Sequence, residues 1–467
     1  MTPKVAIADS PLSQTVRSRD RRCVADIPQK IDTLLSQPEL RTAHWGILVK
    51  NLQNQTTLYQ RGAEQLFVPA SNTKLLTTAA ALVKSGENYR IKTPIYSQGE
   101  GASLNRLRII GKGDPSLTTE QLKTLANHLK SQGIQQIKTL SLVETIAPQN
   151  LLKPTWEWED IYFYYAPAVN QLILNQNTVN LTLSPQAVGQ PLQVTWSDAI
   201  TAKQWQIINQ TRTVSGNPTQ RIRIKGVLGQ PVLVLEGELG NQSEPDITAI
   251  AIPDPVRYFA DSLQQVLTEA GIQVGRVEIT NNPAINSQEK QLLEIESPTL
   301  KELITEINQN SNNLYAESLL NHIQDSDNTA IESLKETLNS LKVENNQYFL
   351  KDGSGLSRQT LVSPTAFVQL LTSMTQSPLG TTYRDSLAIA GQTGTLKNRF
   401  LNTPVVGKLQ GKTGTLSGAI SLSGYLQPTD FAPLVFSILV NNSEQPASIL
   451  RNAIDTIIIE LSQLKPC

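Results

Sequence analysis

The chain has 467 residues, of which 39% are hydrophobic and 17% are charged, a composition typical of a globular protein large enough for two or three domains. Its 40 lysine and arginine residues balance 40 aspartate and glutamate residues, so bulk charge favours neither nucleic acid nor a membrane surface as a partner. Two cysteines and three histidines form no metal-ligand cluster and no nucleophile elbow, which argues against a Ser-His-Asp hydrolase. We expect no metal and no other cofactor.

The two ends of the chain carry the cysteines. Residues 1–22 are polar and charged without an apolar stretch, so we expect a disordered segment there, with neither an export signal nor a membrane-spanning segment visible. Cys23 follows this segment, and Cys467 is the last residue. Two interpretations stay open: unrelated free thiols, or a disulfide that ties the ends together and needs an oxidising compartment.

The first third of the chain predicts a helix and a hairpin, then a buried helix, then a separate α/β unit. Helical spacing of apolar residues and short apolar runs between turn residues give these predictions. In chain order they are a helix at 27–35, strands at 42–49 and 56–59, a buried helix at 71–85, strands at 91–96 and 104–110, a helix at 119–132 and a strand at 137–143.

The character of the sequence then changes twice. Residues 156–165 concentrate scarce aromatic side chains, which either pack in a core or wall a binding cleft. Short strands rich in β-branched residues over 179–240 indicate an all-β module. The remaining predicted elements are a helix at 257–270, a segment at 288–295 that returns to the first domain, helices at 300–307, 314–323 and 364–374, strands at 419–426 and 434–440, and a helix at 447–461.

This order of elements predicts a multidomain α/β protein whose core sheet is covered by helices and interrupted by a long insertion. The core is expected to comprise residues 23–90 and 286–467. A small α/β domain of residues 91–178 and 246–285 is inserted in it, and a small all-β domain of residues 179–245 is nested in the insertion. We expect the insertion to supply substrate recognition rather than catalysis.

Ser71 and Lys74 open the buried helix and form a Ser-x-x-Lys motif. Residues three apart on a helix share a face, so the Lys74 amine can reach the Ser71 hydroxyl. Burial lowers the pKa of a lysine, so a neutral amine could accept the serine proton, and the free N–H groups of the first turn can face an anion. For Ser71 alone, a plain N-cap is the alternative. The same spacing at Ser287 and Lys290 lies in a polar stretch that we interpret as a solvated loop.

Two further motifs accompany the first. Ser311-Asn312-Asn313 lies between two predicted helices, and Lys412-Thr413-Gly414-Thr415 lies at the start of a predicted strand. The Ser-x-Asn pattern also occurs at 103–105 and 215–217, which we interpret as loop residues. A motif of this length means little alone, so the order and the structural context of all three carry the interpretation.

In this order the motifs resemble those of the penicillin-recognising serine acyltransferases, which include β-lactamases and penicillin-binding proteins. The long insertion and several further segments narrow the resemblance to the class C low-molecular-mass penicillin-binding proteins, the D-alanyl-D-alanine carboxypeptidase/endopeptidases. These segments are Gly113-Asp114-Pro115, Trp158-Glu159-Asp160, Lys351 to Ser357, Gly394-Thr395-Leu396 and Arg399-Phe400. The resemblance covers the chain from about Cys23 onward and implies a β-lactamase/transpeptidase-like domain with an antiparallel sheet flanked by helices.

The resemblance also implies roles for the motif residues. Ser71 would attack the carbonyl between two D-alanines, with Lys74 as its base. Ser311 would relay a proton to the leaving amine, and Asn313 would hold the peptide backbone and Lys74. Lys412 would supply positive charge for the substrate carboxylate, which Thr413, Gly414 and Thr415 would bind. The N–H groups of Ser71 and Thr415 would form the oxyanion hole.

Asp160 matches the position that, in this family, binds the free amine of the peptidoglycan side chain. Glu157 and Glu159 are equally plausible acids from the sequence alone, and a solvated acidic turn is a further alternative. The segment 392–395 imitates the Lys412 motif but lacks the lysine, so we interpret it as a structural loop near the site.

The resemblance implies a serine D,D-peptidase with peptidoglycan stem peptides as substrates and β-lactam antibiotics as inhibitors, working in the periplasm or elsewhere outside the cytoplasm. A serine β-lactamase is an alternative, although no deacylating glutamate is recognisable at short range after Ser71. A catalytically silent peptidoglycan-binding homologue is another, and the three intact motifs argue against it.

Overall fold

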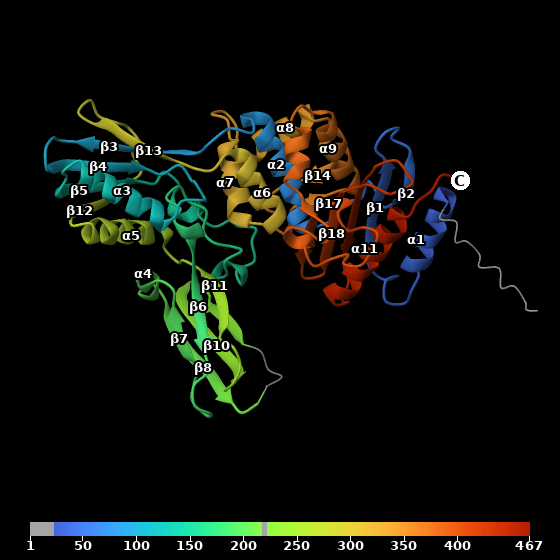
Figure 1. Ribbon diagram of the computed structural model, residues 1–467, viewed down its shortest axis with the longest axis horizontal. Coiled ribbons are helices and arrows are strands. Elements are labelled where there is room, and N and C mark those ends of the chain that lie inside the picture. The colour runs from blue at the N-terminus through green and yellow to red at the C-terminus, as the bar shows by residue number, and fades with distance from the viewer. Residues whose placement is uncertain (1–22, 217–221) are drawn as a thin grey trace, which may run out of the picture.

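The computed structural model describes residues 23–216 and 222–467, so the prediction for residues 1–22 lies outside the described residues. Figure 1 shows three bodies: a large one that contains both ends of the described chain, a second at the far end of the long axis, and a β-rich arm below. Within the described part of the chain, every helix is too short or too polar to cross a membrane.

The large body is built on a six-stranded sheet in the order β16-β17-β18-β19-β1-β2, with every neighbouring pair antiparallel. Its strands are β1 (His44–Asn51), β2 (Thr57–Arg61), β16 (Ala388–Ile389), β17 (Leu409–Leu416), β18 (Ala419–Leu426) and β19 (Leu434–Asn441). Because β1 pairs with β19, the N-terminal hairpin and the C-terminal strands form one sheet. The predicted split core with an antiparallel sheet is confirmed.

Helices cover both faces of this sheet. Side chains of β19 alternate between the two layers, with Phe436 and Ile438 facing one core and Val435 and Leu439 the other. The first layer contains α1 (Ile27–Leu35) and α11 (Ala447–Ser462). The second contains α2 (Thr73–Ser85), α6 (Leu300–Asn310), α7 (Asn313–His322), α8 (Ala330–Ser340), α9 (Pro364–Gln376) and α10 (Gly380–Asp385), with the short strands β14 (Tyr348–Phe349) and β15 (Leu361–Val362) beside them.

Helix α2 lies in the middle of the second layer, where α6, α7, α8 and α9 all contact it. Its residues from Thr73 to Leu82 are buried on every side, as the apolar run predicts. The helix therefore offers a rigid base for any group at its N-terminus.

The second body is a five-stranded sheet in the order β12-β5-β4-β3-β13, with α3 and α5 packed on it. Its elements are β3 (Lys92–Gln98), β4 (Ser103–Ile110), α3 (Thr119–Ser131), β5 (Gln136–Val143), α5 (Pro255–Glu269), β12 (Gln273–Thr280) and β13 (Lys290–Glu296). The segment predicted to return to the core from residue 286 instead adds β13 to this sheet, antiparallel to β3. The prediction was wrong there because Leu293 and Ile295 of β13 pack on the core of the inserted body.

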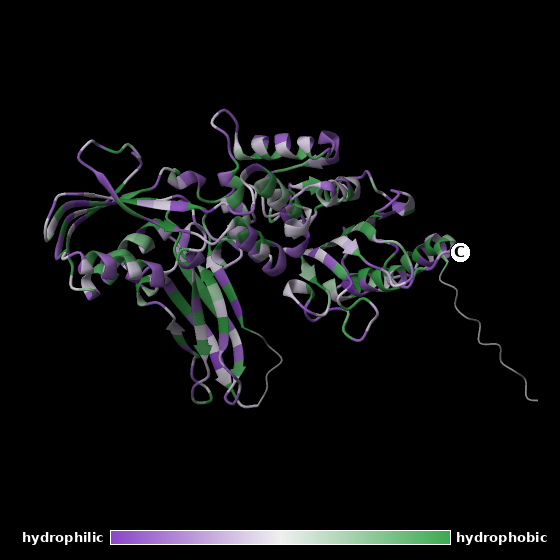
Figure 2. Cartoon of the chain, turned by 45° about the horizontal axis from the view of Figure 1, so that its top comes forward, coloured by the Kyte–Doolittle hydropathy of each residue, from purple (hydrophilic) through white to green (hydrophobic). Residues whose placement is uncertain are grey.

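The arm consists of two three-stranded sheets, β11-β6-β7 and β8-β10-β9, around a shared core. Its elements are β6 (Thr178–Ser184), β7 (Gln193–Trp196), α4 (Ala199–Ala202), β8 (Gln206–Val214), β9 (Arg223–Val227), β10 (Gln230–Gly240) and β11 (Asp246–Ala251). Figure 2 shows hydrophobic and hydrophilic residues alternating along these strands, which is typical of strands with one buried face. The predicted end at residue 245 is wrong, because β11 pairs with β6 over its whole length and extends the arm over 178–251.

Cys23 and Cys467 form a disulfide, with their Cα atoms 5.0 Å apart. Cys23 also makes a parallel β-bridge with Lys465, beside the packed pair α1 and α11. Of the two interpretations left open by the sequence, the structure shows the covalent one.

Candidate active site

Ser71 lies in a short 3-10 turn, Ala70–Asn72, that leads directly into α2. Ala70 has a φ of 48°, a left-handed conformation that is energetically unfavourable for any residue that carries a Cβ atom. Two glycines lie so close to this turn that a larger residue would clash with it. A Cβ on Gly355 would lie 1.9 Å from the Ala70 carbonyl oxygen, and a Cβ on Gly414 would lie 2.7 Å from the Pro69 carbonyl oxygen. The N-cap of α2 is Asn72, so the plain N-cap alternative for Ser71 does not apply.

Lys74 is the second residue of α2 and is fully buried, and its amine lies between three hydrogen-bond acceptors. Its Nζ lies 3.0 Å from Ser71 Oγ, 2.5 Å from Asn313 Oδ1 and 2.7 Å from the carbonyl oxygen of Ser354. Burial lowers the pKa of Lys74 from 10.5 to about 7, against the opposing charges of Asp352 and Glu317. The amine is therefore able to take up or release a proton near neutral pH.

The Ser311-Asn312-Asn313 motif joins α6 to α7. Ser311 ends α6 in a left-handed conformation with a φ of 64°, and Asn312 caps α7 by accepting a hydrogen bond from the N–H of Tyr315 at 3.2 Å. Asn313 is the first residue of α7, and its Nδ2 donates to the carbonyl oxygen of Tyr165 at 2.6 Å. One short connection thus aims Ser311 and Asn313 at two different lysines.

Lys412 lies on β17, three residues after the strand begins, and not at the strand's start as predicted. Its buried Nζ donates to Ser311 Oγ and to the carbonyl oxygen of Thr413, both at 2.9 Å. Burial and the neighbouring Lys74 hold the pKa of Lys412 well below its usual range. Thr413 donates to Thr395 at 2.8 Å, which places the 392–395 loop beside the site.

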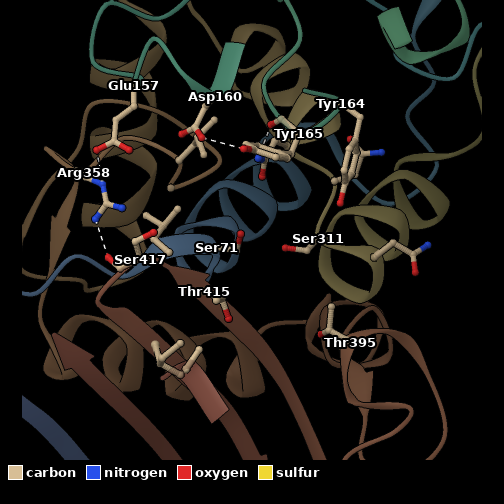
Figure 3. A pocket seen from close by; sticks show the side chains of 18 of the residues that line it. Ser71, Glu157, Asp160, Tyr164, Tyr165, Ser311, Arg358, Thr395, Thr415 and Ser417 are labelled. Atoms are coloured by element: carbon tan, nitrogen blue, oxygen red, sulfur yellow. Dashed lines mark hydrogen bonds and ion pairs between the residues drawn. The ribbon is translucent and has the colours of Figure 1, made fainter. Parts of the chain in front are cut away.

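A cavity of about 1000 Å³ lies over these residues, and Figure 3 shows its walls. Ser71, Ser311, Thr395 and Thr415 face it from the large body. The opposite wall contains side chains of the inserted segment, namely Glu157, Asp160, Tyr164 and Tyr165. Residues of all three motifs and of the inserted segment thus line one cavity. Lys290 of the second Ser-x-x-Lys pattern is instead exposed and pairs with Glu100 at 3.7 Å.

Two of the three candidate acids lie in the cavity. Asp160 accepts a hydrogen bond from the Tyr165 hydroxyl at 2.9 Å, and burial raises its pKa while that hydrogen bond lowers it. Glu157 pairs with Arg358 Nε at 2.6 Å, and Arg358 also donates to the Ser417 carbonyl oxygen at 2.9 Å. Glu159 is exposed and lies outside the lining of the cavity.

Three residues near the site were not found by sequence reasoning. Gln176 lines the cavity and accepts a hydrogen bond from Asn312 at 2.8 Å. Arg358 also lines the cavity and pairs with Glu157, and Glu317 is fully buried on α7. A signal existed for Glu317, which comes four residues after Asn313 and so on the same helix face. Within the described residues, no three histidine, cysteine, aspartate or glutamate side chains form a group that could hold a metal ion.

Comparison with known proteins now identifies the family. The model of the D-Ala-D-Ala carboxypeptidase 3 (S13) family matches residues 27–461. The chain belongs to this family. The family and the peptidase class predicted from the motifs are therefore confirmed.

Individual relatives of this S13 peptidase are similar over most of their length. The D-alanyl-D-alanine carboxypeptidase of Actinomadura sp. (strain R39) is 27% identical over 463 residues, which cover 94% of this chain and 85% of the relative. The penicillin-sensitive carboxypeptidase A of Dictyostelium discoideum is 27% identical over 441 residues, covering 87% and 84%.

The fold of the S13 peptidase is also seen in solved structures. The crystal structure of penicillin binding protein 4 from Haemophilus influenzae superposes with a TM-score of 0.81 at 22% identity, covering 93% of this chain and 99% of the other. A second structure of that protein, complexed with a β-lactam, superposes with a TM-score of 0.75 at 22% identity, covering 93% and 98%.

Proposed function

We propose that this S13 peptidase hydrolyses the D-alanyl-D-alanine bond of peptidoglycan stem peptides, or D,D-cross-links between them, through an acyl-enzyme on Ser71. The observation that carries the proposal is the fully buried Lys74 amine, which has a pKa of about 7 and lies 3.0 Å from the Oγ atom of Ser71, a residue that lines the cavity. This arrangement suits a neutral amine that activates a serine.

The steps follow from the contacts. Neutral Lys74 accepts the Ser71 proton while Oγ attacks the substrate carbonyl, and the N–H groups of Ser71 and Thr415 stabilise the oxyanion. The C–N bond then breaks, and the leaving amine takes up the proton that Lys74 received, relayed by way of Ser311, which Lys412 contacts, so that Lys74 is neutral again. Water finally attacks the acyl carbonyl while neutral Lys74 accepts its proton, and the bond between the acyl carbon and Ser71 Oγ breaks as Lys74 passes this proton to Oγ, which releases the shortened peptide.

Substrate binding is assigned to the rest of the cavity. The substrate carboxylate is placed beside Thr413, Gly414 and Thr415, where its charge would favour a protonated Lys412. Asp160, which lines the wall formed by the inserted segment, would bind a free amine on the side chain of the stem peptide. This proposal is supported by the position of Asp160 in the cavity wall, where the Tyr165 hydroxyl donates to Oδ1 alone.

We also propose that the protein works outside the cytoplasm, in the periplasm or an equivalent compartment. The disulfide between Cys23 and Cys467 supports this, since such bonds persist in oxidising surroundings. β-Lactams are proposed as covalent inhibitors, supported by the β-lactam complex of the structural relative.

Labelling with a fluorescent penicillin tests the proposal, with Ser287→Ala as the matched control for Ser71→Ala because Ser287 starts the second Ser-x-x-Lys pattern. We expect one stable adduct on Ser71 by peptide mass spectrometry and D-alanine release from a synthetic peptide ending in D-Ala-D-Ala. Ser71→Ala should lose the adduct and at least about a thousandfold of the activity, whereas Ser287→Ala should lose neither.

Two outcomes would replace the proposal. Rapid turnover of a chromogenic cephalosporin without a trapped adduct would identify a β-lactamase. Folded wild-type protein that neither reacts with penicillin nor releases D-alanine, yet binds peptidoglycan, would identify a silent homologue.

A further inference from the structure

Glu317 is a fully buried carboxylate that the steps above do not use. It lies on α7 one helical turn after Asn313, and its exposed fraction is 0%. Burying a carboxylate is unfavourable unless the protein supplies hydrogen bonds or an opposite charge. The contacts of Glu317 therefore show which groups stabilise this buried carboxylate and which segment it positions.

Those contacts hold one end of a tight loop. The Oε1 atom of Glu317 accepts hydrogen bonds from the N–H groups of Gly353 at 2.9 Å and Ser354 at 2.8 Å. Its Oε2 atom has no hydrogen-bond partner among the described residues, and Lys153 Nζ of the inserted segment lies 3.6 Å from it. Burial raises the pKa of Glu317 and the neighbouring Asp352 adds to this, whereas Lys153 and the hydrogen bond from Ser354 act in the opposite direction and favour the ionised carboxylate.

The carbonyl groups of the same loop point to α2. The Ser354 carbonyl oxygen accepts from Lys74 Nζ at 2.7 Å, and the Gly353 carbonyl oxygen accepts from Thr77 Oγ1 at 2.7 Å. Glu317 thus accepts hydrogen bonds from the N–H groups of residues 353–354, and a carbonyl group of the same segment accepts a hydrogen bond from the Lys74 amine. Helix α7 contacts this amine twice, directly through Asn313 and through the loop by Glu317.

We propose that Glu317 is a positioning residue that fixes the Ser354 carbonyl against Lys74 and sets how readily this amine releases its proton. The inference rests on the proposed function, since it needs Lys74 to act as a base. The titratable groups that face Lys74 or its helix are Glu317 on α7, Asp352 in the loop, Lys412 on β17 and Tyr383 on α10, with Lys153 behind Glu317.

The sign of the effect follows from the charges. Burial lowers the pKa of Lys74, and the negative charge of Glu317 opposes this. Removing that charge should lower the pKa further, so neutral amine is present at more acidic pH. The acylation rate should then rise at lower pH than in the wild type.

Glu317→Gln keeps the shape and one acceptor oxygen but removes the charge. Acylation by a fluorescent penicillin, followed by stopped flow from about pH 5 to about pH 9, should show a midpoint lower by about half a unit or more. The exposed Glu64→Gln is the control and should match the wild type. A folded Glu317→Gln variant with the wild-type midpoint would overturn the inference.

Glu317→Asp separates position from charge, because the shorter side chain keeps the charge but cannot reach both N–H groups. We expect a plateau rate several-fold lower with a midpoint near that of the wild type. If Glu317→Gln does not fold, an unchanged plateau in Glu317→Asp overturns the inference. Failure of the proposed function looks different, because then the wild-type protein itself would not be labelled.

Discussion

Lys74 combines a helix position with burial in a way that decides its chemistry. An ordinary lysine with a pKa of 10.5 would have only about one neutral amine in three thousand at pH 7. With the pKa at about 7, half of the amines are neutral at that pH. The difference arises mainly from desolvation on α2, since the two nearby carboxylates act in the opposite direction.

The first prediction at this scale is the pH dependence of the wild-type enzyme. Below its pKa Lys74 is protonated and cannot accept the Ser71 proton, so the acylation rate should fall about tenfold per pH unit below about pH 7 and level off above it. Penicillin acylation rates measured at fixed ionic strength check this. A rate that stays constant from about pH 5 to about pH 8 would contradict a lysine base.

Part of the site could be predicted from residue spacing alone. The contact between Lys74 and Ser71 follows from their spacing of three residues, although Ser71 lies in the turn before α2, whereas Ser311 and Lys412 were found through the resemblance to the family. The contact between Glu317 and the 353–354 backbone could not be predicted, because it joins segments far apart in the sequence through main-chain N–H groups. A motif of side chains carries no information about which backbone atoms it meets.

The turn Asn175–Asn177 lies near the site and consists entirely of residues with a left-handed backbone. Its three residues, Asn175, Gln176 and Asn177, all have positive φ values, of 49°, 58° and 53°. Such conformations persist where surrounding contacts fix them. The side-chain amide of Asn175 donates hydrogen bonds to the hydroxyls of Thr119 and Tyr258. The side-chain amide of Asn177 donates to the Ala168 carbonyl oxygen and to Asn170 Oδ1. The strain leaves Gln176 pointing at Asn312 in the active-site loop.

We predict that Gln176→Ala slows acylation without preventing it. The variant loses the 2.8 Å hydrogen bond to Asn312, whose net value of about 0.5–1.5 kcal/mol corresponds to about a 2- to 12-fold lower rate if the loop must be held for reaction. Labelling of Ser71 should still reach completion. Gln265→Ala on the exposed face of α5 is the control, and equal rates for both variants would exclude the role of the turn.

Strands were easier to predict than their partners. The alternation of apolar residues indicates which face of a strand is buried, but the same pattern fits several sheets. The residues of both β11 and β13 were therefore assigned to the wrong domain, although the core strands β1, β18 and β19 lie close to where the sequence predicts them. The repeated Asn of 175–177 was an available signal for left-handed backbone, since Asn enters this conformation more readily than most residues.

At the scale of the molecule, the insertion contacts residues of the candidate active site as well as lining the cavity. The Trp156 indole donates to Asp352 at 3.1 Å, the Tyr165 carbonyl accepts from Asn313, and Lys153 lies beside Glu317. The expectation that the insertion supplies only recognition was incomplete. A variant without the insertion would lose these supports, so a peptidase core isolated in this way should not retain full activity.

The disulfide predicts a response to reduction. Cys23→Ser with Cys467→Ser should lower the unfolding free energy of the body that contains α1 and α11 by about 2–4 kcal/mol. Calorimetry should show a lower Tm than the wild type without reductant and no difference with reductant. Two free thiols in unfolded, unreduced wild-type protein would contradict the covalent pairing.

The same bond has a topological consequence. A chain whose first described residue is bonded to its last is a closed ring of covalent bonds. A single proteolytic cut in any exposed loop between Cys23 and Cys467 opens the ring but releases no fragment, so the two halves of the split core stay at high effective concentration. Such a protein can be nicked in a protease-rich environment and still remain one molecule.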